Sequence, residues 1–398
     1  LLSTPEQNYI VSLLSGEDMT IDGLTFDCRN LTIDGGDAGL ASCAVYLPVT
    51  QAPFRNVHIK NNKFINIPTT SQSFHAVGMS GADCFVTNNY IPKCGGDVLN
   101  FNGGNYIVTG NIILGSGDGG IAFNNGATGI IANNVIEKCD LGIGCGPEGG
   151  TQDKDLYTHK MLIDGNQITG CRYGILMGWF AFGGRSGPTN FVIANNVIQK
   201  TKISAFRYDG HNNTWEVNGI ITGNAIAGTG SEMYDGKKGE DIIDIAIVNC
   251  GLMTVSGNSI VRPEGTGKKT AILVYDSDAV IISGNNIKSG NNAGNNYNYG
   301  IQFIDSMNSD CNGNTIAETE LGIISEDNNR IRPRNLSINN NRIYDYLLRA
   351  VQVIESATHF TISGNTIVTR STGQVAVDIS ATELSYFTVT NNNIDVPD

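Results

Sequence analysis

The sequence predicts an all-β fold, a parallel β-helix of about thirteen coils. An Asn followed two residues later by Ile or Phe recurs thirteen times, usually after a second Asn or a Gly. The shortest spacings between these recurring asparagines, Asn89 to Asn111 and Asn111 to Asn134, are 22 and 23 residues. That is about the length of one coil with three short strands and three corners. A repeat of this kind is typical of a solenoid, whose stacked units bury a shared core.

Each repeat contains the strands and the turn that such a coil needs. A short run of alternating apolar residues, such as 191–193, precedes the turn, and a second run, such as 120–123 or 300–303, follows in the coil. Asn and Gly accept positive φ at low cost, so a tight turn at each Asn-Asn or Gly-Asn step is expected. The recurring Asn itself is predicted to be structural, with side-chain amides stacked from coil to coil.

Length and composition favour one elongated domain over residues 1–398. A net charge of −13 argues against a nucleic-acid partner, and no apolar run is long enough for membrane insertion. The motifs of nucleotide, zinc-protease, serine-hydrolase and dinucleotide sites are absent, so neither a cofactor nor a metal is expected.

The nine cysteines are predicted to be free and buried. Their number is odd and no CxxC pair occurs. Small side chains lie five residues after the recurring Asn of consecutive coils, and they include three of the cysteines: Cys94, Ser116, Cys139, Cys171, Thr201 and Thr229. A repeated core or corner position explains this row better than disulfides or zinc.

The repeat is longest between Asn134 and Asn258, which predicts enlarged lateral loops between about residues 145 and 245. Insertions in a solenoid emerge as loops on the flank, often on a binding face. These loops hold both tryptophans of the chain together with carboxylates and amides. Aromatic rings beside directional polar groups are typical of carbohydrate binding.

Cleavage of a glycosidic bond usually requires two carboxyl groups, and neighbouring coils can bring two acids together without a local motif. The candidate catalytic acids are Asp209, Glu216, Glu232 and Asp235, with Asp118 and Asp140 as a second stacked pair. The candidate substrate-binding residues are Tyr173, Trp179, Arg207, Tyr208, His211 and Trp215. Solvation on a surface loop explains any one of these acids alone, and only their grouping favours catalysis.

The chain also resembles a known protein family. The features that carry the resemblance are the repeated turns V-T-G-N-x-I and I-x-N-N-x-I, the stretch 117–124 and the unpaired cysteines. It resembles the right-handed parallel β-helix domains of bacteriophage tailspikes, which are polysaccharide depolymerases of the pectate-lyase-like superfamily. The resemblance implies a homotrimer that hydrolyses a bacterial surface polysaccharide (O-antigen, capsule or exopolysaccharide) with paired acids. It also implies a place in the virion tail, with secretion as the alternative.

Other functions remain open on the same fold. A polysaccharide lyase would use residues such as His159, Tyr157 and Lys160, although an acidic groove suits a polyuronate poorly unless a metal neutralises the charge. A fructan transferase or another glycosidase would also use acid pairs. A non-catalytic adhesin would need the aromatic residues but no acid pair.

Overall fold

The computed structural model describes residues 9–13, 16–32, 42–47, 54–146, 160–178, 190–210, 217–230, 242–261, 269–289, 297–328, 333–369 and 372–395. The chain divides into two compact units, Leu1–Val192 and Ile193–Asp398. Every element of the described residues is a β-strand, and every pairing between named strands is parallel. Among these residues no helix has the length and hydropathy to span a membrane.

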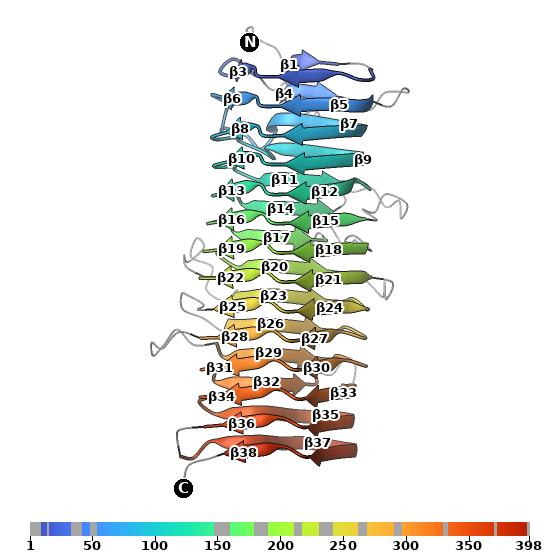
Figure 1. Ribbon diagram of the computed structural model, residues 1–398, viewed down its shortest axis with the longest axis vertical. Helices are drawn as coiled ribbons and strands as arrows, with labels where there is room; N and C mark the ends of the chain where they lie inside the picture. Colours follow the sequence, from blue (N-terminus) through green and yellow to red (C-terminus); the bar gives the residue numbers. More distant parts are fainter. Residues whose placement is uncertain are drawn as a thin grey trace. The chain divides into compact units, whose positions relative to one another are not determined.

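Unit 1 is a β-helix with three strands per coil (Figure 1). Its first ladder comprises β1 (Tyr9–Ser12), β4 (Ser42–Leu47), β7 (Phe74–Thr87), β9 (Leu99–Thr109), β11 (Gly119–Asn124), β14 (Leu141–Gly146) and β17 (Tyr173–Met177). Its second ladder comprises β2 (Thr20–Asp22), β5 (Phe54–Lys60), the ends of β7 and β9, β12 (Thr128–Ala132) and β15 (Met161–Asp164). Its third ladder comprises β3 (Thr25–Asp27), β6 (Lys63–Ile65), β8 (Tyr90–Ile91), β10 (Ile112–Ile113), β13 (Val135–Glu137) and β16 (Gln167–Thr169).

Unit 2 repeats this plan, and β18 (Asn190–Ala194) contains the point where the chain divides. The first ladder comprises β20 (Ser204–Asp209), β23 (Ile242–Val248), β26 (Lys269–Tyr275), β29 (Tyr299–Ile304), β32 (Leu321–Glu326), β35 (Arg349–Ser363) and β37 (Val375–Thr390). The second comprises β21 (Asn218–Thr222), β24 (Met253–Ser256), β27 (Ile281–Ser283), β30 (Asp310–Asn312), β33 (Arg334–Asn339) and the ends of β35 and β37. The third comprises β19 (Val197–Gln199), β22 (Ala225–Ala227), β25 (Ser259–Val261), β28 (Asn286–Lys288), β31 (Thr315–Ala317), β34 (Arg342–Tyr344), β36 (Thr366–Val368) and β38 (Asn393–Asp395).

The turn before each strand of the third ladder has the predicted backbone. The first residue of the Asn-Asn or Gly-Asn pair is left-handed in all thirteen repeats. Where it is Asn, φ lies between 54° and 56°, at Asn61, Asn88, Asn133, Asn195, Asn340 and Asn391. Where it is Gly, φ lies between 62° and 67°, at Gly110, Gly165, Gly223, Gly257, Gly284, Gly313 and Gly364. Other residues would strain this turn, which explains the sequence repeat.

The recurring Asn forms the predicted ladder of stacked amides in each unit. In unit 1, Asn111 Nδ2 donates to Asn134 Oδ1 at 3.0 Å and to the Val86 carbonyl at 2.8 Å. Asn111 Oδ1 accepts the backbone N–H and the side-chain amide of Asn89, both at 3.0 Å. The same side-chain bond joins each recurring Asn to the Asn of the next coil. The series runs from Asn62 through Asn166 in unit 1 and from Asn196 through Asn392 in unit 2. Each amide thus satisfies backbone groups that the corner leaves without a strand partner.

We expect Asn111→Ala to lower the free energy of unfolding by about 2–4 kcal/mol, because it leaves buried donors of Asn89 and the Val86 carbonyl unsatisfied. Urea unfolding measures the change. Asn286→Ala is the control, because Asn286 is exposed and should move stability by less than about 0.5 kcal/mol. Equal effects of the two substitutions would contradict a stabilising role for the ladder.

The interior of each unit is apolar and includes every cysteine. In unit 1 the rings of Phe101, Tyr106 and Phe123 pack against one another, with centroids 4.5–5.7 Å apart. All nine cysteines are free and buried, as predicted. Burial raises the pKa of the Cys94 and Cys250 thiols to about 12. Thiolates are therefore scarce at neutral pH.

We expect a thiol-specific reagent to leave the native protein almost unmodified at pH 8, because burial denies it both access and thiolate. After denaturation it should titrate all nine thiols. Absorbance of the released chromophore gives the count. Rapid reaction of several thiols before unfolding would show that the core is open to solvent.

Asp244 is a carboxyl group of unit 2 that lies in the core beside a tyrosine. Asp244 is completely buried, and its Oδ2 accepts a hydrogen bond from the hydroxyl of Tyr297, which is also buried. Burial raises the pKa of Asp244 to about 6, although hydrogen bonds from Thr229 and Tyr297 oppose the shift. Ionisation of this group therefore costs stability.

Proton binding at Asp244 makes the stability of the folded state depend on pH. Between the unfolded pKa of 3.8 and the folded value of about 6, the folded state binds more protons at Asp244, so stability falls as the pH rises through that window. Asp244→Asn removes the titration. We expect the difference in unfolding free energy between variant and wild type to shift in the variant's favour by about 2.4 kcal/mol from pH 4 to pH 7.5. Urea unfolding at both values tests this, with exposed Asp310→Asn as control.

Candidate functional site

The strand register of unit 1 brings Asp118 and Asp140 onto neighbouring coils, as the sequence predicts. Gly119 pairs with Leu141, which pairs with Tyr173, so the residue before each of these lies in one column. The backbone N–H of Asp140 donates to the Asp118 carbonyl at 2.9 Å. The column thus consists of two acids followed by Arg172, whose N–H donates to the Asp140 carbonyl at 3.0 Å.

The side chains beside this acid pair supply a cation and a ring. Arg172 Nη1 lies 3.8 Å from Asp140 Oδ2, and its guanidinium lies over the ring of Tyr173, 5.3 Å from the centroid. All four side chains are partly exposed. Two carboxyl groups, one cation and one aromatic face are therefore accessible on three successive coils.

A hydrogen-bonded chain of polar side chains covers the adjoining outer face of the first ladder. Asp97 accepts the Gly119 N–H at 2.8 Å and the Asn100 side-chain amide at 3.1 Å. Asn100 Oδ1 in turn accepts from Asn102 at 3.0 Å, and Asn102 Oδ1 accepts from Asn125 at 2.9 Å. Amides fixed in this way are suited to contact hydroxyl groups.

Residues with little or no side chain lie beside these amides. Gly78 and Ala122 flank Asn100 in the register, and Gly144 follows Ala122. At Gly144 an added Cβ would meet only Leu141 Cδ1, at 3.4 Å. All three residues are buried, so small side chains allow the neighbouring strands and the amides to pack closely here.

A surface pocket of about 420 Å³ lies at the same corner of unit 1. It is lined by Thr69, Pro92, Lys93, Cys94, Leu114, Gly115, Ser116, Gly117 and Lys138. Gly117 directly precedes Asp118, and Lys138 lies two residues before Asp140. The pocket thus adjoins the acid pair along the chain.

In unit 2, β20 positions three of the predicted site residues. Arg207 and Asp209 alternate outward and form an ion pair, with Arg207 Nη2 3.2 Å from Asp209 Oδ2. Tyr208 alternates inward between them and is fully buried. We therefore leave Tyr208 out of the candidate site, because its side chain faces the core.

The remaining predicted site residues lie outside the described residues. They are Trp179, His211, Trp215, Glu216, Glu232 and Asp235. Of the lyase alternatives, Tyr157 and His159 also lie outside, whereas Lys160 is described and exposed. Their roles stay predictions.

A second acidic column in unit 2 was not predicted. Successive backbone bonds, from Asp276 N–H to the Ile304 carbonyl and from Asp305 N–H to the Glu326 carbonyl, place Asp276, Asp305 and Asp327 at one turn of consecutive coils. Burial raises the pKa of Asp305, with a further contribution from Asp327. Asp305 is fully buried, so it cannot contact a polymer directly. Among the described residues, no group of three or more His, Cys, Asp or Glu side chains could hold a metal ion.

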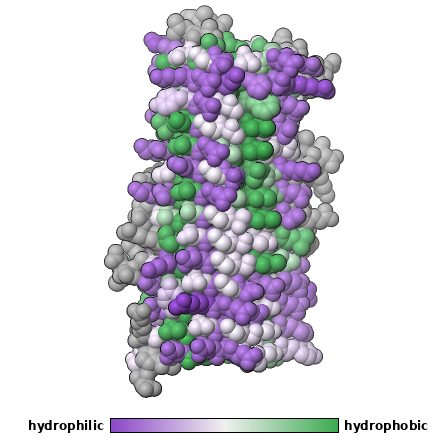
Figure 2. Space-filling view, viewed as in Figure 1, coloured by the Kyte–Doolittle hydropathy of each residue, from purple (hydrophilic) through white to green (hydrophobic). Residues whose placement is uncertain are grey.

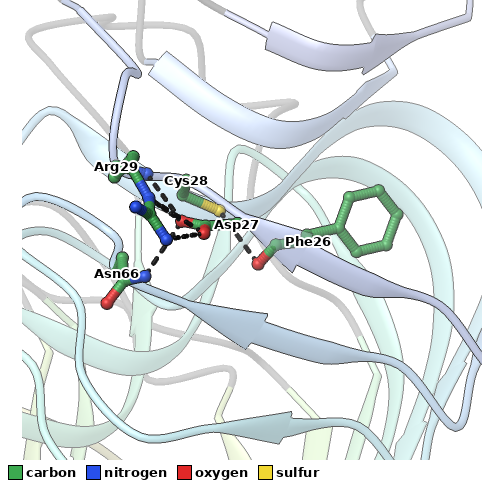
Figure 3. Close-up of polar contacts among 5 residues, drawn as sticks. All are labelled: Phe26, Asp27, Cys28, Arg29 and Asn66. Atoms are coloured by element: carbon green, nitrogen blue, oxygen red, sulfur yellow. Dashed lines mark hydrogen bonds and ion pairs between the residues drawn. The ribbon is translucent and has the colours of Figure 1, made fainter. Parts of the chain in front are cut away.

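Asp27, at the end of β3 in unit 1, differs from the acid pair because its side chain is held by hydrogen bonds within the protein (Figure 3). Asp27 accepts hydrogen bonds from Arg29 Nε at 2.9 Å and from Asn66 Nδ2 at 2.9 Å. These partners hold the pKa of Asp27 well below its usual range. Such an acid stays ionised and is unsuited to donate a proton.

The outer face of the second ladder in unit 1 carries an apolar strip. His58, Phe85, Ile107, Ile130 and Leu162 follow one another in the register. The rings of His58 and Phe85 stack with centroids 4.5 Å apart. Figure 2 shows hydrophobic side chains gathered over these strands. This strip is a surface feature separate from the acid pair.

Several residues around Asp118 and Asp140 were not predicted from the sequence. Asn100 and Asn102 alternate with the core residues Leu99 and Phe101, so a period of two already marks them as outward-facing. Arg172 directly precedes Tyr173, which was singled out. The pocket walls come from separate coils, so no run of neighbouring residues in the sequence marks the pocket.

The family model "Right handed beta helix region" matches residues 20–181. A search of curated proteins found no match. Solved structures that resemble the chain include the periplasmic alginate epimerase AlgG, with 13% identity and a TM-score of 0.45 over 91% of this chain and 84% of that one. The A-module of the Azotobacter vinelandii mannuronan C-5 epimerase AlgE6 has 13% identity and a TM-score of 0.43, covering 89% and 91%. The Siphovirus 9NA tailspike receptor-binding domain has 12% identity and a TM-score of 0.42, covering 98% and 74%.

Proposed function

We propose that this protein is a glycoside hydrolase that cleaves a polysaccharide with the paired carboxyl groups of Asp118 and Asp140. The observation that carries the proposal is the register that places these acids on neighbouring coils at an accessible corner of unit 1. One carboxyl protonates the leaving oxygen while the other acts as base or nucleophile.

The neighbouring side chains divide the two roles. Arg172 lies beside Asp140 and favours its ionised form, so Asp140 is the base or nucleophile. Asp118 is then the proton donor. The ring of Tyr173 offers a face for the C–H groups of a sugar, and the half-buried amide of Asn102, held by the buried Asn100, orients hydroxyl groups.

The finer proposal is a tailspike-like depolymerase of a bacterial surface polysaccharide. It acts as a homotrimer outside the cell as part of a virion tail. The turns and unpaired cysteines that resemble tailspikes support it. The enlarged loops predicted between about residues 145 and 245 remain candidates for substrate binding, and in unit 2 the ion-paired Arg207 and Asp209 remain candidates in their own right.

A lyase is the second candidate, and the contact between Arg172 and Tyr173 favours it. An Arg that neutralises a uronate carboxylate next to a Tyr that transfers a proton is suited to β-elimination. The two reactions give different products. Elimination leaves a double bond that absorbs in the ultraviolet, whereas hydrolysis adds a reducing end without one.

The test is incubation with a panel of bacterial surface polysaccharides, with reducing ends and ultraviolet absorbance both recorded. We expect Asp118→Asn and Asp140→Asn each to lower kcat/KM at least 100-fold, because each removes a proton-transfer group. Asp83→Asn, at an exposed position of β7, is the matched control and should change it less than threefold.

Three outcomes would reject the proposal. Cleavage within tenfold of wild type in both variants, about 1.4 kcal/mol of barrier, would place the chemistry elsewhere. New ultraviolet absorbance would establish a lyase. Binding with unchanged polymer length across the panel would indicate an adhesin.

A further inference from the structure

We propose that the pocket beside Asp118 is a subsite for a negatively charged sugar residue of the polysaccharide. The inference rests on the proposed function, and it deepens it by naming the class of substrate. The ligand is recognised by its anionic group, a carboxylate, phosphate or sulfate, through Lys93 and Lys138.

The charge at the pocket is opposite to that of the chain. The protein has 38 acidic and 25 basic residues, a net charge of −13. Yet the charged side chains that line the pocket are both lysines, Lys93 and Lys138. In the described part of the chain neither ammonium group has an ion-pair partner. A local excess of positive charge on an acidic protein attracts an anion to this pocket.

Lys138 lies at a turn position that is left-handed in several coils, as Lys200 and Glu318 also show. Glu137 pairs with Thr169, so Lys138 on one coil corresponds to Gly170 on the next. Both are left-handed, with φ of 55° and 69°. Gly adopts this conformation without strain, whereas Lys does so at a cost. Lys at the pocket edge therefore accepts a conformation for which the next coil uses Gly.

Gly170 lies directly beside the stem of the lysine. A Cβ added at Gly170 would lie 3.8 Å from Cγ of Lys138, in contact with its stem. The remaining walls are suited to a sugar. The backbone of 114–117 and the side chain of Ser116 surround a volume within the range of small-ligand sites.

The position of the pocket connects it with the chemistry. Its wall ends at Gly117, and the next residue is the proposed proton donor Asp118. A sugar held by Lys93 and Lys138 therefore lies next to the glycosidic bond that reaches the acid pair. The polymer cleaved here carries an acidic residue adjacent to the cleaved bond.

The experiment measures binding of glucuronic acid, glucose 6-phosphate, glucose 6-sulfate and glucose by calorimetry at low salt. We expect the charged sugars to bind and glucose to bind at least tenfold more weakly. The double variant Lys93→Gln with Lys138→Gln should weaken the charged sugars at least tenfold. Lys200→Gln is the matched control, because Lys200 is exposed with φ of 52° and does not line the pocket. It should bind like wild type.

Equal binding of glucose and the charged sugars, or unchanged binding by the double variant, would overturn the subsite. Cleavage assays separate this failure from failure of the proposed function. If the Asp118 and Asp140 variants lose cleavage while the double lysine variant keeps its KM for acidic polymers, the hydrolase stands and the subsite is wrong. If lysine-dependent binding occurs but no polymer is cleaved, the subsite stands and the hydrolase is wrong.

Discussion

The side-chain amide of the recurring Asn is the interaction on which each unit of this fold depends. A coil must turn three times, and each turn leaves backbone groups that a strand ladder does not satisfy. Asn meets this need because one amide both donates and accepts, so the bonds that close one corner also fix the next coil. The preceding left-handed residue directs the amide inward. The corner therefore sets the register of the strands that follow it.

That register explains why the fold could be predicted from the sequence in detail. The turn, the ladder and the buried thiols all follow from single positions repeated at coil spacing, and the structure confirms each of them. Local chemistry and long-range contact coincide in a solenoid, because a residue meets its own equivalent in the next coil. In most folds the local structure and the long-range contacts must be inferred separately.

The candidate site could be predicted only in part, because the repeat identifies residues at equivalent positions of adjacent coils and no others. Asp118 and Asp140 could be paired because they occupy equivalent positions in consecutive coils. Lys93 and Lys138 both lie four residues after the recurring Asn, but Gly115 occupies that position in the coil between them, so a comparison of adjacent repeats alone does not join the two lysines. Tyr208 was predicted to bind substrate together with Arg207, but successive side chains of a strand face opposite sides, and Tyr208 faces the core. Proximity along a strand is a poor guide to a shared surface, since successive side chains face opposite sides.

The acids of this protein show how position decides what a carboxyl group can do. Asp27 is held ionised by Arg29, Asp244 is withdrawn from water, and Asp140 lies between an acid and a guanidinium at the surface. Of these three acids, only Asp140 has a side chain that is substantially exposed, at 34%.

The spacing from Asn134 to Asn166 is ten residues longer than that from Asn89 to Asn111, yet Val135 still pairs with Gln167 and Ile136 with Ile168. Closure of the coil is therefore indifferent to the number of residues between its strands. Evolution can lengthen, shorten or exchange the connecting segments without refolding the scaffold, and recombination between related genes can alter substrate range in one step.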